Sequence, residues 1–168
     1  MVSLKSKGFL SKLYYWLPVI VLFVSVLNEF DLNYLDLNYF SFNFPFILIF
    51  FFTLKEFKHF DYSLVFIAGM INDTVVGLPL GISSLSYMLI CIATSYFRNI
   101  TIRPNPTKDW FYFLFVISLV NSINYSILTL FFSYNLILWN YIINIFFTFL
   151  FYLVFISLFK FYMRGLND

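Results

Sequence analysis

The sequence predicts an all-α integral membrane protein that crosses a lipid bilayer six times and keeps both termini in the cytoplasm. Of its 168 residues, 62% are hydrophobic and 11% are charged, whereas a typical soluble domain is about 25% charged. A soluble chain of this length could not bury so much apolar surface, so the bilayer is its natural solvent. The net charge of +2 gives no reason to expect nucleic acid as a partner.

Helix breakers and charged residues divide the chain into six apolar segments, which we interpret as one transmembrane domain over residues 1–168. A membrane-spanning helix needs about 17–25 residues, and only the third and fourth segments are slightly short. Joined as one helix they would extend about 54 Å at 1.5 Å per residue, which is too long for one span. We therefore expect two short helices joined by a Gly/Pro turn. The six segments are 9–28, 37–54, 62–76, 82–97, 110–132 and 136–159.

The basic residues support this division because they fall only in alternate connections and at the two ends of the chain. The intervening connections, 29–36, 77–81 and 133–135, contain neither lysine nor arginine. Cytoplasmic loops of membrane proteins are enriched in these residues, so the alternation predicts the orientation of every segment. The ten basic residues are Lys5, Lys7, Lys12, Lys55, Lys58, Arg98, Arg103, Lys108, Lys160 and Arg164.

The first segment has a second interpretation, because lysines followed by an apolar run are also typical of a cleavable signal peptide. The run is followed by Asn28-Glu29-Phe30-Asp31, with no small-x-small cleavage site. We therefore expect it to be retained as the first span.

Candidate catalytic and metal-binding groups are few. Glu29, Asp31 and Asp36 lie in the first outer connection and are expected to be solvated rather than to act as a catalytic pair. His59 is the only histidine and Cys91 the only cysteine, which excludes an internal disulfide and any multi-cysteine metal site. We expect no catalytic residue, no metal and no cofactor.

Polar side chains recur at helical spacing inside three segments, and each set would lie along one helix face. In lipid, such faces should turn toward other helices. They could bind neighbouring helices together or line a hydrophilic cavity, and the residues alone leave both open. The sets are Ser84, Tyr87, Cys91 and Thr94; Ser118, Ser122, Tyr125 and Thr129, with Asn121 beside them; and Asn140, Asn144, Thr148 and Tyr152.

The stretch GMINDTVVGLPLG, residues 69–81, places an aspartate within long apolar surroundings. A charged side chain at mid-membrane costs about 2.5–3.5 kcal/mol, so Asp73 needs a reason to be there. It could cap the following helix, pair with a group on a neighbouring helix, or contact a partner protein. Gly69 shares its helix face and would allow a neighbouring backbone to approach closely. Ser83 or Ser84 is expected to cap the fourth segment.

The same stretch resembles the central motif of the rod shape-determining protein MreD family, roughly G-x-x-x-D, three residues, G-x-P-L-G, three residues, L. Phe97-Arg98, at the end of the fourth segment, is also similar to that family. The resemblance makes these positions a candidate partner-binding or structural motif. The matching residues are Gly69, Asp73, Gly77, Pro79, Leu80, Gly81 and Leu85, with Arg98 added from the end of the segment.

What the resemblance implies is a non-catalytic inner-membrane component of the bacterial cell-elongation machinery, the elongasome, which supports sidewall peptidoglycan synthesis and cell shape. Such proteins associate with the single-span protein MreC and, through it, with the filament protein MreB and the RodA–PBP2 synthase. The first alternative is a small-molecule, vitamin-type substrate-binding subunit of a membrane transporter. An intramembrane enzyme is the least favoured, because Asp73 has no histidine or lysine at membrane depth to assist it.

Overall fold

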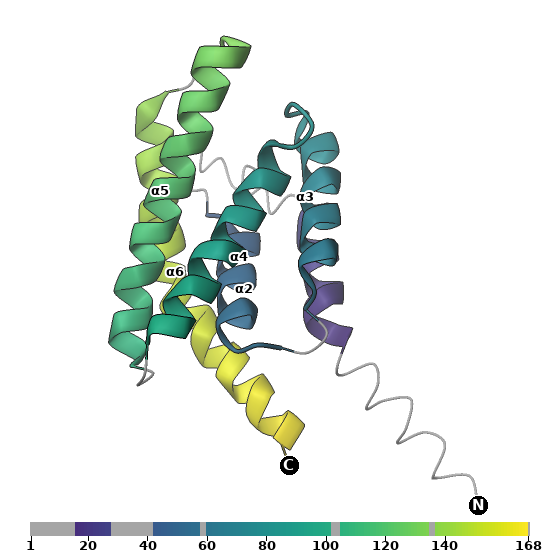
Figure 1. The fold of residues 1–168 in the computed structure, drawn as a ribbon, viewed down its shortest axis with the longest axis vertical. Coiled ribbons are helices and arrows are strands. Elements are labelled where there is room, and N and C mark those ends of the chain that lie inside the picture. The colour runs from purple at the N-terminus through teal and green to yellow at the C-terminus, as the bar shows by residue number, and fades with distance from the viewer. Residues whose placement is uncertain (1–15, 28–41, 58–59, 102–104, 135–136, 168) are drawn as a thin grey trace, which may run out of the picture.

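The computed structural model describes residues 16–27, 42–57, 60–101, 105–134 and 137–167. The regular secondary structure of this part of the chain consists of six helices and no strand, and the helices run alternately up and down beside one another (Figure 1). The turn between α3 and α4 lies at one end of the bundle and the C-terminus at the other. The helices are Trp16–Leu27, α2 (Phe44–Leu54), α3 (Tyr62–Val76), α4 (Ile82–Ile100), α5 (Pro106–Phe132) and α6 (Leu138–Asn167).

Helix α2 is the core of the bundle. Phe44 and every residue from Phe46 to Thr53 are buried, as expected for a helix that is hydrophobic on all sides. Its start is fixed by Asn43, whose Oδ1 accepts a hydrogen bond from the backbone N–H of Phe46 at 3.2 Å. At 11 residues, α2 is shorter than the predicted segment 37–54, of which residues 37–41 lie outside the described part of the chain.

Helices α5 and α6 are the two that are long and apolar enough to cross a membrane, over Pro106–Phe132 and Leu138–Met163. Both begin or end beyond the predicted segments 110–132 and 136–159. Helix α5 starts earlier because Asn105 Oδ1 accepts from the N–H of Thr107 at 3.0 Å and proline occupies the first turn. Three of the remaining helices are shorter but apolar: Trp16–Leu27, α2 and α3.

Helices α3 and α4 form an antiparallel hairpin. Helix α3 has the predicted bounds, whereas α4 continues three residues beyond the predicted end at residue 97, to Ile100. The prediction of short third and fourth helices is thus right for α3, with 15 residues, and less so for α4, with 19. Ser84, Tyr87, Cys91 and Thr94 are all buried on the inner face of α4, as their spacing predicts.

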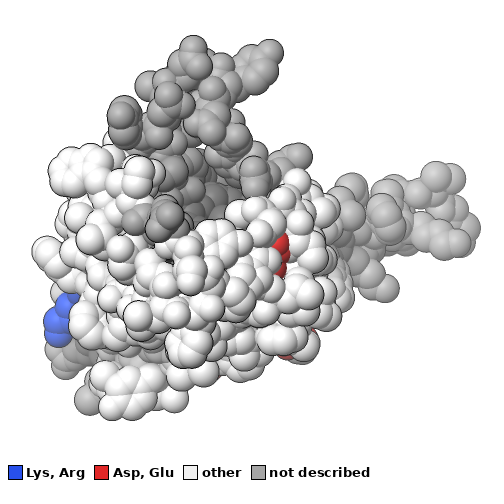
Figure 2. Space-filling model, turned by 90° about the horizontal axis from the view of Figure 1, so that it is seen from above, with Lys and Arg blue, Asp and Glu red and all other residues white. Residues whose placement is uncertain are grey.

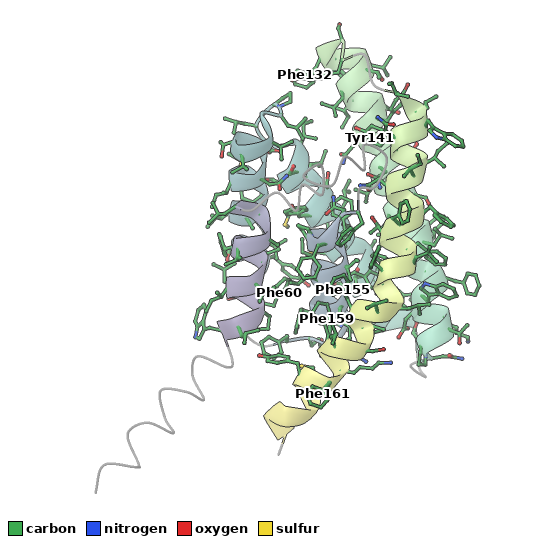
Figure 3. All side chains as sticks on the ribbon, turned by 180° about the vertical axis from the view of Figure 1, so that it is seen from behind. Phe60, Phe132, Tyr141, Phe155, Phe159 and Phe161 are labelled. Atoms are coloured by element: carbon green, nitrogen blue, oxygen red, sulfur yellow. The ribbon has the colours of Figure 1, made fainter. Side chains whose placement is uncertain are left out.

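Aromatic rings fill the space around α2. Phe113 of α5 stacks on Tyr152 of α6, with ring centroids 4.5 Å apart, and Phe50 of α2 lies 4.9 Å from Phe113. Figure 3 shows Phe155 and Phe159 of α6 beside α2, toward the end of the bundle opposite the α3–α4 turn. Such ring pairs contribute about 0.5–1.5 kcal/mol each beyond the burial of their area, so aromatic packing holds α5 and α6 against the core.

Charged side chains gather at one end of the bundle. All those placed by the structure lie near the end opposite the α3–α4 turn, except Asp73. Viewed from the turn end, nearly all the described residues in sight are uncharged (Figure 2). The predicted positions Lys5, Lys7, Lys12, Glu29, Asp31, Asp36, Lys58, His59 and Arg103 lie outside the described residues. The clustered side chains are Lys55, Glu56, Asp61, Arg98, Lys108, Asp109 and Lys160.

Candidate functional site

The turn between α3 and α4 depends on two glycines with left-handed backbone angles. Gly77, at the end of α3, has a φ of 73°, and Gly81, at the start of α4, has a φ of 104°. Residues with a Cβ atom rarely adopt these angles. The N–H of Leu78 returns to the carbonyl of Asp73 at 2.9 Å, which closes the end of α3 in the way typical of a glycine-terminated helix.

Asp73 caps the start of α4 from across the turn. Its side chain is fully buried, and its two carboxylate oxygens accept hydrogen bonds from the backbone N–H groups of Gly81 at 2.7 Å and Ser83 at 2.8 Å. The first N–H groups of a helix have no partner within the helix and carry partial positive charge, which favours a carboxylate there. Of the three roles considered for Asp73, the structure therefore shows the first, capping of the following helix.

Gly69 brings the two helices of the hairpin into close contact. A Cβ atom on this residue would lie 2.4 Å from the Cα and 2.6 Å from the backbone nitrogen of Ser84. No side chain fits at such distances, so the close approach expected from the sequence requires glycine. The hydroxyl of Ser84 donates to the carbonyl of Phe66 at 3.0 Å and adds a second link between α3 and α4.

The prediction that Ser83 or Ser84 caps α4 is wrong. The residue at the cap position is Gly81, and the capping oxygens come from Asp73. Ser83 Oγ instead accepts from Nδ2 of Asn72 at 2.8 Å. A carboxylate displaces a hydroxyl in this role because a charged acceptor forms the stronger hydrogen bond with the helix start.

The tip of the hairpin is apolar and exposed. Leu80 is 65% exposed and Leu85 is 40% exposed, and both belong to the predicted motif. Pro79 beside them is partly buried. The motif therefore has two kinds of residue. Gly69 and Asp73 pack inside the hairpin, whereas Leu80 and Leu85 face outward.

Arg98 is not part of this site. It lies fifteen residues along α4 from Ser83, about 22 Å at 1.5 Å per residue. Its Nη1 donates to the carbonyl of Thr53 at 3.0 Å and its Nη2 lies 2.7 Å from Oε1 of Glu56. A cation is favoured at a helix C-terminus, so Arg98 holds α4 to the end of α2.

A cavity of about 450 Å³, lined by both polar and apolar side chains, lies at the turn end of the bundle. The helices that line it include α2, α5 and α6, and the turn end of α3 and α4 completes the wall. Within the described residues its lining carries no lysine, arginine, histidine or carboxylate. Figure 3 shows Tyr141 of α6, one of the lining residues, at this end. Six asparagines belong to the lining: Asn43, Asn72, Asn121, Asn124, Asn140 and Asn144.

The polar stripes are only partly as predicted. Along α6, Thr148 and Tyr152 are buried, Asn144 is partly buried and Asn140 lies exposed at the rim of the cavity. Along α5 the prediction fails only at Ser122, which is exposed, whereas Ser118, Tyr125 and Thr129 are partly buried and Asn121 is buried.

Two hydroxyls on this part of α5 find partners on their own helix. Ser126, one turn beyond Ser122, donates to the Ser122 carbonyl at 2.9 Å, and Thr129 donates to the Tyr125 carbonyl at 2.7 Å. The face that does point inward carries Asn121 and Asn124.

Sequence reasoning missed Asn43, Asn72 and Asn124 as members of the cavity. A signal was available, since each lies in the half of its helix that adjoins a connection without lysine or arginine. The described residues contain no cluster of three histidine, cysteine or acidic side chains that could hold a metal ion. Comparison with protein-family models, with characterised proteins and with solved structures finds no match to this chain.

Proposed function

We propose that this chain is a non-catalytic scaffold in the inner (cytoplasmic) membrane of a bacterium, and that it serves the cell-elongation machinery as proteins of the MreD family do. Six helices, two of them long enough to span a bilayer, support a multi-pass arrangement. Charged side chains gathered at one end of the bundle support an orientation in which that end meets the cytoplasm.

The observation that carries the proposal is the α3–α4 hairpin. Its backbone is fixed by Gly69 against Ser84 and by the Asp73 cap, while Leu80 extends outward. A binding surface held rigid before its partner arrives loses less conformational entropy on association. An apolar tip of this kind suits the transmembrane helix of a single-span protein of the MreC type.

In this proposal the chain contacts the lipid bilayer and the MreC-type protein directly. It is linked only indirectly to an MreB-type filament and to a RodA–PBP2 type synthase. A non-catalytic role is supported by Asp73, the one acidic side chain in the structure away from the charged end, because both of its oxygens are already engaged by backbone N–H groups.

The test is photo-crosslinking in living cells. A photoreactive amino acid replaces Leu80 at the hairpin tip or, as the matched control, Phe161 of α6, which is 79% exposed near the other end of the bundle. We expect the Leu80 position, and not Phe161, to capture a single-span membrane protein, identified by mass. If the inserted protein gives no adduct from Leu80, or the same adducts from both positions, the scaffold proposal fails.

A transporter-type binding subunit is the second candidate, and the cavity of about 450 Å³ favours it. Pockets for small ligands usually measure about 300–1,000 Å³. The two functions differ in what accompanies the purified protein. A small molecule retained together with the subunits of a transport module would favour the second, and a retained single-span protein the first.

A further inference from the structure

The cavity at the turn end holds a polar group that the fold leaves without a partner. Asn121 of α5 is 7% exposed, and its Nδ2 atom is buried with no hydrogen-bond partner among the described residues. A buried donor in this state costs about 1–3 kcal/mol. Because Asn121 lines the cavity, an acceptor placed there would satisfy it.

The neighbouring amides are held in place by hydrogen bonds that use only part of their capacity. Asn124 Oδ1 accepts from Ser86 Oγ at 2.9 Å, Asn43 Oδ1 accepts from the N–H of Phe46 at 3.2 Å, and Asn72 Nδ2 donates to Ser83. A side-chain amide offers two donors and two acceptor lone pairs. The wall of the cavity therefore presents both donors and acceptors in orientations fixed by the fold.

The charge and the aromatic content of the cavity lining limit the class of ligand that could bind. The described lining residues carry no ionisable acid or base other than two tyrosines, so they offer no counter-ion to a charged ligand. Aromatic side chains, among them Phe42, Phe44 and Tyr141, supply apolar surface beside the amides. Closely spaced hydroxyls on an apolar ring match this combination of groups.

We propose that this cavity binds a neutral sugar, either free or as the headgroup of a lipid. Asn121 Nδ2 donates to a sugar oxygen, and the other asparagines bind the remaining hydroxyls. This inference stands on the cavity alone and holds whether or not the chain serves cell elongation.

The test measures binding as a rise in Tm, since a ligand that binds only the folded state stabilises it. The full chain is purified in a polyoxyethylene detergent, which carries no sugar. One arm adds free methyl glucoside or N-acetylglucosamine, and the other adds dodecyl maltoside, whose sugar is attached to an alkyl chain. Glucosamine and glucuronate serve as the matched cation and anion.

We expect a neutral sugar in at least one arm to raise Tm, and glucosamine and glucuronate to leave it unchanged. A response to the free sugars identifies a soluble ligand, and a response to dodecyl maltoside alone identifies a lipid headgroup. Asn121→Leu keeps the number and branching of the side-chain heavy atoms and removes the donor, so the sugar-induced rise should be lost. Asn99→Leu, at an exposed position near the far end of α4, should keep it.

Three results would overturn the proposal. Neutral sugars give no rise in either arm, the charged analogues raise Tm as much as the neutral ones, or Asn121→Leu responds as the unmodified chain does. The first result would mean that the Asn121 amide is simply buried without a partner and binds no ligand. Asn121→Leu would then raise the Tm of the ligand-free protein without any effect on binding.

Discussion

Replacing Gly69 by alanine separates the effect of helix propensity from that of tertiary packing, because the two predict changes in stability of opposite sign. Alanine in place of glycine in a helix interior stabilises that helix by about 0.8–1 kcal/mol. In the hairpin, however, the added Cβ would lie 2.4 Å from the Cα of Ser84. Unstrained carbon atoms lie about 3.5–4.0 Å apart, so α3 and α4 must separate by about 1 Å.

The cost of that separation follows from what lies beside Gly69. Overpacking of this kind costs about 1–3 kcal/mol. A shift of about 1 Å would also carry one of the two Asp73 bonds, now 2.7 and 2.8 Å long, beyond hydrogen-bonding range. Each bond to a charged acceptor contributes about 1.5–3 kcal/mol. With one such bond lost and the gain in propensity subtracted, we expect Gly69→Ala to destabilise the protein by about 1.5–5 kcal/mol.

The assay uses Cys91, the only cysteine in the chain, which is fully buried on α4. A thiol-reactive fluorophore reports its exposure as the protein in detergent is heated, with circular dichroism as an independent record of helix loss. For a chain of this size, about 2–4 °C of Tm corresponds to 1 kcal/mol, so Tm should fall by at least about 3 °C.

The control is the double variant with Ser84→Ala, which should not recover Tm, because the clash is with the backbone of Ser84 rather than with its hydroxyl alone. An unchanged or higher Tm for Gly69→Ala, or full recovery in the double variant, would refute the packing argument.

Two further pairs of substitutions test the ends of the helices. Asp73→Asn removes the charge and one of two acceptors and should cost about 1.5–3 kcal/mol, whereas Asn72→Ala removes one neutral bond and should cost about 1 kcal/mol; equal falls in Tm would contradict the capping role. Arg98→Ala should lower Tm more than Glu56→Gln, because Glu56 is exposed and such ion pairs contribute about 0–1 kcal/mol, while the bond from Arg98 to the carbonyl of Thr53 ends α2. Equal effects on Tm would instead assign the role of Arg98 to the ion pair.

The sequence predicts the hairpin well because its signals are local. Glycine and proline mark the turn, and the spacing of Gly69 and Asp73 places both on the face of α3 that meets α4. The charged residue before it and the glycine after it give the bounds of α3. The family resemblance groups Arg98 with the hairpin, whereas the length of α4 places Arg98 at the opposite end of the bundle.

The polar faces were harder to predict, because a serine or threonine in a helix can bond either to a neighbouring helix or to its own backbone four residues earlier. On α5, Ser126 and Thr129 take the second course. Asparagine has no such simple local solution in a helix interior, so Asn121 and Asn124 turn inward. The cavity could not be deduced from periodicity, since its lining comes from helices far apart in the sequence.

The orientation of the chain in a membrane is the claim on which the outward-facing hairpin and cavity both depend. Reporter fusions measure it directly, with an enzyme active only outside the cytoplasm and another active only within it. Fusions at residues 33 and 135 should report the outside, and fusions at residues 58 and 104 the inside. An exchange at any of these positions, or recovery of the protein in the aqueous fraction after cell breakage, would contradict the account.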